Sequence, residues 1–177
     1  MRTWQQDKKW SDRFIPEIKS IVGPYVISEA PIQEDMKHNT DLMVLRAADL
    51  RIACRIRRFS YYTNKAYRGE FTIRSSRPGG ATTELKKVMR GWGDLFFYGF
   101  SDEYQKQLKA WFIGDLSVFR SWVRGKLDKG IRPGVSMGNP DGVMFRAFRQ
   151  DEIPGFILAD SETVHKVKQP EQLGLFG

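Results

Sequence analysis

The segment from Leu50 to Phe59 constrains the fold of this chain more than any other, because its side chains alternate in character with a period of two. Such alternation is typical of a β-strand whose two faces meet different surroundings. One face carries Ile52, Cys54 and Ile56, and the other carries Arg51, Ala53, Arg55 and Arg57. We therefore predict a half-buried strand with its apolar face in the core and its arginine face toward solvent.

A continuous apolar run from Asp41 to Leu45 comes just before this segment and predicts a buried strand. The connection Ala47-Ala48-Asp49 is short, so we expect the two strands to pair as a hairpin. Other strands are predicted where β-branched and aromatic residues stand between turn signals. These strands are Tyr25–Ser28, Glu70–Arg74, Leu95–Phe100, Ala110–Ile113 and Phe156–Ala159.

Three segments have apolar residues at helical spacing. They are residues 10–22 with Pro16 in the first turn, a short helix capped by Thr82 or Thr83 and ended by Gly91, and a helix capped by Asp115 or Ser117. We expect a tyrosine-rich loop over residues 61–68 and a loop-rich region after the third helix, with a turn at residues 138–142. The order of elements predicts an α/β (α+β) fold, with a central mixed β-sheet flanked by helices.

Length and composition favour one globular domain over residues 1–165, followed by a flexible tail over residues 166–177. The chain has 177 residues, of which 41% are hydrophobic and 13% aromatic, enough to bury a core. It opens without an apolar run and has no stretch long enough to cross a bilayer, so we expect a cytoplasmic protein with no membrane partner. The single cysteine, Cys54, excludes an internal disulfide and a paired-cysteine zinc site.

The positive charge of the chain favours a polyanionic partner such as DNA. Lysine and arginine number 29 against 21 acidic residues, which gives a net charge of +8. Guanidinium groups suit phosphates and tyrosine rings can stack on bases. The alternative is a solvated sheet face with tyrosines at its rim. The predicted DNA-binding residues are Arg51, Arg55, Arg57, Arg58, Tyr61, Tyr62, Lys65, Arg68, Arg74 and Arg77.

The last residues, Gln172-Leu173-Gly174-Leu175-Phe176, place apolar anchors at fixed spacing after a polar segment that contains Pro170. They resemble the pentapeptide with which replication and repair proteins bind the bacterial DNA polymerase III β sliding clamp, and only the middle position, Gly174, departs from it. The resemblance implies that Gln172, Leu173, Leu175 and Phe176 bind the clamp. The alternative is a C-terminus that packs on its own domain.

The order helix, three strands, helix, strand resembles the restriction-endonuclease-like fold of the PD-(D/E)XK nucleases, over about residues 10–123. Those enzymes hold Mg²⁺ between an acid that begins one strand and a glutamate on the next, with a lysine nearby. Asp41 matches the first acid, but the next strand offers no carboxylate and only Arg55 or Arg57 in place of the lysine. The resemblance implies catalytic roles for Asp41, Arg55 and Glu70 or Glu84, with Asp41 and Glu70 as the preferred Mg²⁺ ligands.

Asp41 could equally cap a turn at the start of its strand, and Glu70 could be a charge at a sheet edge. Three functions therefore remain open. The first is a Mg²⁺-dependent DNA endonuclease or exonuclease of replication or repair, recruited by the sliding clamp. The second is a non-catalytic adaptor that binds DNA and the clamp. The third is a phage or mobile-element protein that inhibits host replication by occupying the clamp pocket.

Overall fold

A computed structural model describes residues 4–23, 27–29, 42–44, 51–64, 67 and 69–162. The chain divides into two compact units, residues 1–50 and residues 51–177. Helices and strands occur in both units, which confirms a mixed α/β chain of the α+β kind. Each unit is described below by itself.

The first unit contains two short helices and a pair of short strands. Helix α1 (Trp4–Asp12) and helix α2 (Ile15–Val22) replace the single helix predicted over residues 10–22. Pro16 explains the break, because a proline ring clashes with the carbonyl four residues earlier, here that of Asp12, and ends α1 there. The same proline is tolerated in the first turn of α2. Strands β1 (Ile27–Glu29) and β2 (Leu42–Val44) pair antiparallel.

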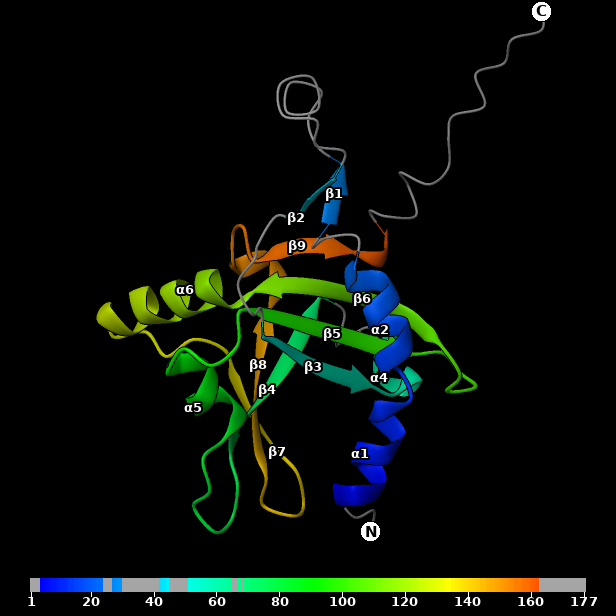
Figure 1. The fold of residues 1–177 in the computed structure, drawn as a ribbon. Helices are drawn as coiled ribbons and strands as arrows, with labels where there is room; N and C mark the ends of the chain where they lie inside the picture. Colours follow the sequence, from blue (N-terminus) through cyan, green and yellow to red (C-terminus); the bar gives the residue numbers. More distant parts are fainter. Residues whose placement is uncertain are drawn as a thin grey trace, which may run out of the picture. The chain divides into compact units, whose positions relative to one another are not determined.

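The second unit contains two sheets (Figure 1). The larger sheet has the order β3 (Ile52–Arg57), β5 (Leu95–Ser101), β6 (Leu108–Asp115) and β9 (Ile157–Asp160), in which only β3 and β5 are parallel. The smaller sheet is antiparallel, with β8 (Met144–Arg149) between β4 (Glu70–Ser76) and β7 (Val135–Gly138). The helices are α4 (Phe59–Thr63), α5 (Glu84–Met89), α6 (Leu116–Asp128) and a 3₁₀ turn, η3 (Gln150–Glu152).

The predicted hairpin between the strands near residues 41–45 and 50–59 is wrong. Strand β2 pairs with β1, and β3 pairs with β5 across a connection that contains β4 and α5. Strand β5 explains the choice: Phe96, Phe97 and Tyr98 are buried on both of its faces, so it needs a neighbouring strand on each side. It finds them in β3 and β6.

Two regions that were predicted to be loops contain regular structure. Residues 59–63 form α4 instead of the beginning of a tyrosine-rich loop. The region after α6 contains the hairpin of β7 and β8, whose turn lies where the glycine- and proline-rich stretch predicts it. In that turn the backbone N–H of Asn139 donates to the carbonyl of Val143 at 2.9 Å, and the Asp141 carboxylate accepts from the Val143 N–H at 3.0 Å.

The predicted cap positions of the helices in the second unit are confirmed, although the Thr83 side chain makes no capping hydrogen bond. Asp115 precedes α6 and its carboxylate accepts from the backbone N–H groups of Ser117 and Val118 at 2.7 and 3.3 Å. Thr83 occupies the N-cap position of α5. After that helix Gly91 adopts a φ of 92°, the left-handed conformation that ends many helices.

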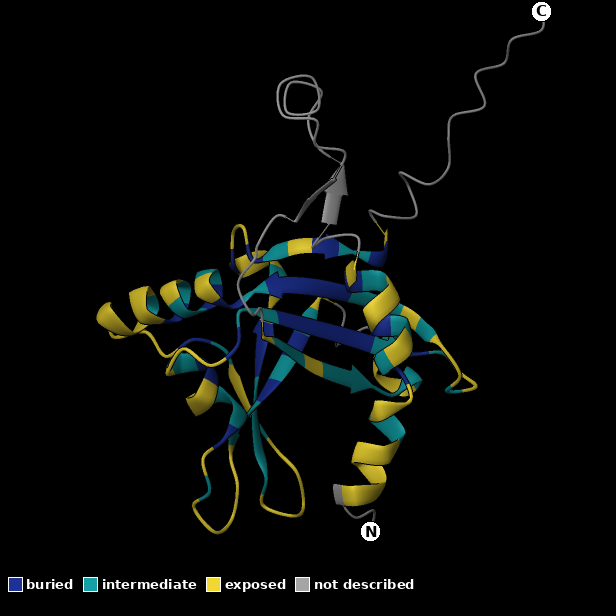
Figure 2. Ribbon diagram, in the orientation of Figure 1, coloured by how far each residue is buried: buried dark blue, intermediate teal, exposed yellow. Residues whose placement is uncertain are grey.

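An aromatic core joins the two sheets and α6. Phe71 of β4 is fully buried, and its ring contacts Phe96 and Phe112 of the larger sheet, Phe148 of the smaller sheet and Phe119 of α6 at centroid distances from 5.5 to 5.9 Å. Figure 2 shows β5 as a largely buried strand and β6 as buried in its second half, whereas the β7–β8 turn is exposed. The second unit therefore has one core, formed where the sheets face each other.

Candidate nucleic-acid interface

The arginine face of β3 is half-buried and turns toward the aromatic core, which corrects its predicted exposure to solvent. Ala53 packs against the aromatic core, and the register places Ala53 and Arg55 beside Phe96 and Tyr98 of β5, both buried. Cys54, on the opposite face, is exposed. The reason is that arginine stems pack well on aromatic rings, so a strand can turn arginines inward when their charged ends find partners.

Arg55 and Arg74 both contact Glu84, the first residue of α5. The Nη1 atom of Arg55 donates to Oε2 of Glu84 at 2.7 Å, and the same carboxylate oxygen accepts from the backbone N–H of Arg74 at 3.1 Å. Both guanidinium groups lie over the ring of Phe145 on β8, at 4.9 and 5.8 Å from its centroid. We call Arg55, Arg57 and Arg74 the arginine cluster.

Arg57 occupies the other end of this cluster. Its guanidinium lies 3.8 Å from the ring centroid of Tyr61 in α4. Burial lowers the pKa of the Arg57 guanidinium below its ordinary value, and the neighbouring charge of Arg55 lowers it further. Within the described part of the chain, no carboxylate lies at ion-pairing distance from Arg57.

A small pocket opens beside Arg57. Its volume is about 30 Å³, enough for one or two water molecules or for part of a small anion. The hydroxyl groups of Thr72 and Tyr98 lie 3.4 Å apart there, so one of them can donate to the other. The polar lining consists of Arg57, Tyr61, Tyr67, Glu70, Thr72 and Tyr98.

The arginine cluster contains hydrogen-bond donors that no described residue accepts from. In the described residues, the Nε atoms of Arg55 and Arg74 are buried and have no hydrogen-bond partner. A buried donor without a partner costs about 1–3 kcal/mol, so such groups are retained where a ligand or water satisfies them. Three guanidinium groups with one paired carboxylate also leave positive charge uncompensated. Both properties suit an oxyanion, since guanidinium forks bind phosphates and carboxylates with paired hydrogen bonds.

The predicted Mg²⁺ ligands, Asp41 and Glu70, stay a prediction. Glu84 contacts Arg74, and Glu70 stands four residues earlier on β4, so the backbone positions of Glu70 and Arg74 are about 13 Å apart along the strand. Asp41 lies outside the described residues. In the ranges that are described, no three His, Cys, Asp or Glu side chains form a group that could hold a metal ion.

The remaining predicted DNA-binding residues are scattered. Arg51 and Arg77 are exposed. Arg58 donates to the side chain of Gln105 at 3.2 Å, and Tyr62 packs against the rings of Phe59 and Phe100 instead of facing solvent. Lys65, Arg68 and the clamp-binding residues Gln172, Leu173, Leu175 and Phe176 lie outside the described residues.

Several residues of this region were not anticipated from the sequence. Phe145 lies beneath two arginines, and Thr72 and Tyr98 line the pocket. The alternation of aromatic and basic residues in Met144-Phe145-Arg146-Ala147-Phe148-Arg149 was the available signal, because it is the pattern of a strand. It was missed because arginine occupied positions where a core strand normally has apolar residues.

No helix in the described ranges combines the length and the apolar character that crossing a membrane requires. Comparison with protein-family models, with curated proteins and with solved structures found no match to this chain.

Proposed function

We propose that this chain is a DNA-binding protein of replication or repair, that its arginine cluster holds backbone phosphates, and that its last residues tether it to the bacterial β sliding clamp. One observation carries the DNA-binding part of the proposal. The Arg55 guanidinium and the Arg74 backbone N–H share the Glu84 carboxylate, Arg57 follows Arg55 by two residues on the same face of β3, and the buried Nε–H groups of Arg55 and Arg74 are without partners among the described residues. A phosphate supplies both the missing charge and the missing acceptors.

The site favours phosphate because its surroundings are partly desolvated. Only 14% of the Arg55 side chain is exposed, and charges attract more strongly where water is displaced. A phosphodiester also presents several acceptor oxygens, which match the several donors of the cluster. The tyrosine rings at the pocket can contact the attached sugar or base.

The clamp peptide explains how a binding site of this size reaches its DNA. A few phosphate contacts give weak and salt-sensitive affinity. A peptide bound to a ring that encircles DNA raises the local concentration of the attached unit, so two weak interactions reinforce each other. Deleting residues 172–177 should abolish co-elution of the protein with the purified clamp, whereas undiminished co-elution would refute the tether.

The DNA-binding part is tested by measuring affinity for a short duplex as a function of salt concentration. In Arg57→Gln, the slope of log affinity against log salt should be less steep by about 0.9, because one phosphate contact is lost. The control is Arg149→Gln, which removes one positive charge from an exposed residue already paired with Asp151 at 2.7 Å. Equal slopes in Arg57→Gln and Arg149→Gln would refute a phosphate at the arginine cluster.

A second candidate function is DNA cleavage on a restriction-endonuclease-like core. The order β3, β4, α5, β5 in the second unit supports it, together with Asp41 directly before β2. We rank it second because Glu84, one of its candidate catalytic carboxylates, is already paired with Arg55 at 2.7 Å. Incubating branched or plasmid DNA with Mg²⁺ decides between them: cleavage that Asp41→Ala and Glu70→Ala both abolish would establish the nuclease, and intact DNA would leave the adaptor.

A further inference from the structure

Trp92 is 62% exposed, although tryptophan is a large apolar residue that usually lies inside. It follows α5, and the sequence suggests an anchor in the core at this position. That expectation is wrong. An indole ring that is held at the surface by well-packed backbone is typical of a binding residue rather than of a packing residue.

The backbone around Trp92 is fixed. The N–H of Trp92 donates to the carbonyl of Lys87 at 3.1 Å, and the flanking glycines, Gly91 and Gly93, have φ values of 92° and 85°. Gly93 is buried, and its carbonyl accepts from Nη1 of Arg120 at 3.0 Å. The turn therefore cannot swing the indole inward without breaking these bonds, so the ring is presented outward.

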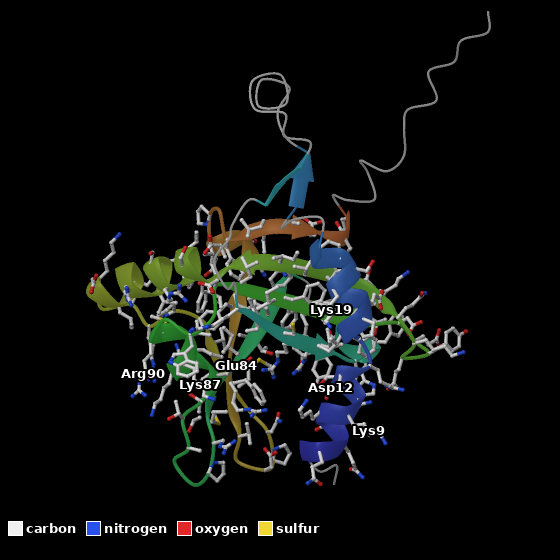
Figure 3. All side chains as sticks on the ribbon, in the orientation of Figure 1. Lys9, Asp12, Lys19, Glu84, Lys87 and Arg90 are labelled. Carbon is white, nitrogen blue, oxygen red and sulfur yellow. The ribbon has the colours of Figure 1, made fainter. Side chains whose placement is uncertain are left out.

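Several exposed cations come from α5, which precedes Trp92, and from the neighbouring α6. Lys86 and Lys87 on α5 and Arg90 at its end are exposed, and Figure 3 shows Lys87 and Arg90 extending outward from α5. Arg124 of α6 is exposed as well, and its Nη2 atom lies 3.5 Å from the carbonyl of Met89. The carboxylate next in sequence belongs to Asp94, which accepts from the backbone N–H of Arg51 at 2.9 Å. The Trp92 surface consists of Lys86, Lys87, Arg90, Trp92 and Arg124.

We propose that the Trp92 surface binds unpaired nucleotides of a single strand, with the indole stacked on a base and the cations on the flanking phosphates. The inference rests on the proposed DNA-binding function and names the kind of DNA. Every base has a flat face on which an aromatic ring can stack, but in a duplex that face is covered by the neighbouring base pairs. An exposed indole among cations therefore favours a single strand over a duplex.

The position of α5 supports this assignment. Its first residue, Glu84, contacts the arginine cluster, and its last residue, Met89, lies three residues before Trp92. Six helical residues span about 9 Å, so one strand can reach both places. Tyr104 offers a contrast: it is 76% exposed, but it follows Asp102 and Glu103, which repel phosphates.

The test compares Trp92→Leu, Trp92→Phe and the control Tyr104→Leu for binding to a fluorescent oligo(dT) and to a duplex of equal length. Trp92→Leu should bind oligo(dT) about 5- to 150-fold more weakly, the range expected for one stacked base, and should bind the duplex like the wild type. Trp92→Phe keeps an aromatic ring and should retain most of the affinity. Arg90→Gln should reduce the salt dependence of oligo(dT) binding by about 0.7 in slope.

The outcomes separate this inference from the proposed function. If Trp92→Leu binds oligo(dT) as well as Tyr104→Leu does, the stacking assignment is overturned, while salt-dependent duplex binding would still support the proposed function. An equal loss toward oligo(dT) and duplex would overturn the preference for unpaired bases. If the wild type binds no DNA, both proposals fail. A defect of Trp92→Leu in clamp binding alone would reassign the surface to a protein partner.

Discussion

The Glu84 carboxylate has two opposing roles, and replacing it with an amide separates them. In the free protein it neutralises part of the arginine cluster through Arg55 at 2.7 Å and through the N–H of Arg74 at 3.1 Å. In a DNA complex the same negative charge would repel the phosphate that shares these arginines. We therefore expect Glu84→Gln to weaken folding and to strengthen DNA binding.

The size of each effect follows from the geometry. Only 14% of the Arg55 side chain and 28% of the Glu84 side chain are exposed, so the pair is largely desolvated. Hydrogen bonds to charged groups contribute about 1.5–3 kcal/mol, and because glutamine still offers an acceptor we expect a loss of about 1.5–2 kcal/mol. A phosphate about 6 Å from the carboxylate would meet a repulsion of about 3 kcal/mol at an effective dielectric constant of about 20. Screening reduces this, so we expect DNA affinity to rise about tenfold.

Urea unfolding gives the first quantity and anisotropy of a labelled oligonucleotide at constant salt gives the second. Asp151→Asn is the matched control, because it removes an exposed carboxylate whose partner Arg149 is also exposed. It should leave stability unchanged and alter DNA affinity only through net charge. Glu84→Gln that is as stable as the wild type would refute the structural role of the pair. A fall in its DNA affinity would show that phosphate does not bind at the arginine cluster.

Three further results are expected. Gly114→Ala should lower the free energy of unfolding by about 1–3 kcal/mol in urea, because a Cβ there would overlap the buried ring of Phe156. Gly125→Ala in α6 meets no atom within 4 Å and should raise the same free energy by about 0.5–1 kcal/mol. Cys54 is exposed as a residue, but partial burial of its sulfur raises the pKa of the thiol. Iodoacetamide at pH 8.5 should therefore alkylate the native protein more slowly than the urea-unfolded chain, and equal rates would refute the shift. The folded state favours the neutral thiol, so its contribution to the free energy of unfolding is fully present below the thiol pKa of the unfolded chain. That contribution should be lost as the pH rises through the higher thiol pKa of the folded protein. Urea midpoints of the wild type and of Cys54→Ala, compared over this pH range, measure the loss.

Local signals predicted the elements whose boundaries local chemistry sets. The cap at Asp115 and the stop at Gly91 depend on a few neighbouring residues, and both are found where the sequence places them. The strand alternation near residue 52 is equally local, and β3 begins there. The α+β class followed from the sum of these elements.

Pairing and orientation could not be obtained in this way. The predicted hairpin is wrong because the partner of β3 lies about forty residues away in β5. No local sequence pattern indicates a pairing over that separation. The predicted orientation of β3 is wrong because the prediction assumed that charged side chains face solvent. Arg55 can lie on this face because the Glu84 carboxylate of α5 pairs with its guanidinium and the Phe145 ring of β8 packs against it. The candidate site was therefore recognised as basic, but its geometry came from the structure alone.

Trp92 shows that hydrophobicity, like charge, does not by itself predict whether a side chain is exposed. Its neighbours in sequence, a helix stop and a strand, favour a core position by hydrophobicity alone. The next residue, Gly93, is buried, and its carbonyl accepts from Nη1 of Arg120 on α6 at 3.0 Å. A contact between residues that far apart determines where the indole points, and the sequence gives no indication of it.

The strand order also determines when this unit can fold during synthesis. Among the described residues, β4 has β8 as its only partner strand, and the larger sheet is bounded by β9. Both sheets thus stay incomplete on the ribosome until nearly the whole unit has been made, and β4 and β5 emerge with aromatic side chains that have no surface to cover them. The nascent chain should therefore depend on holdase chaperones, and its C-terminal strands, rather than its first ones, should commit it to the native state.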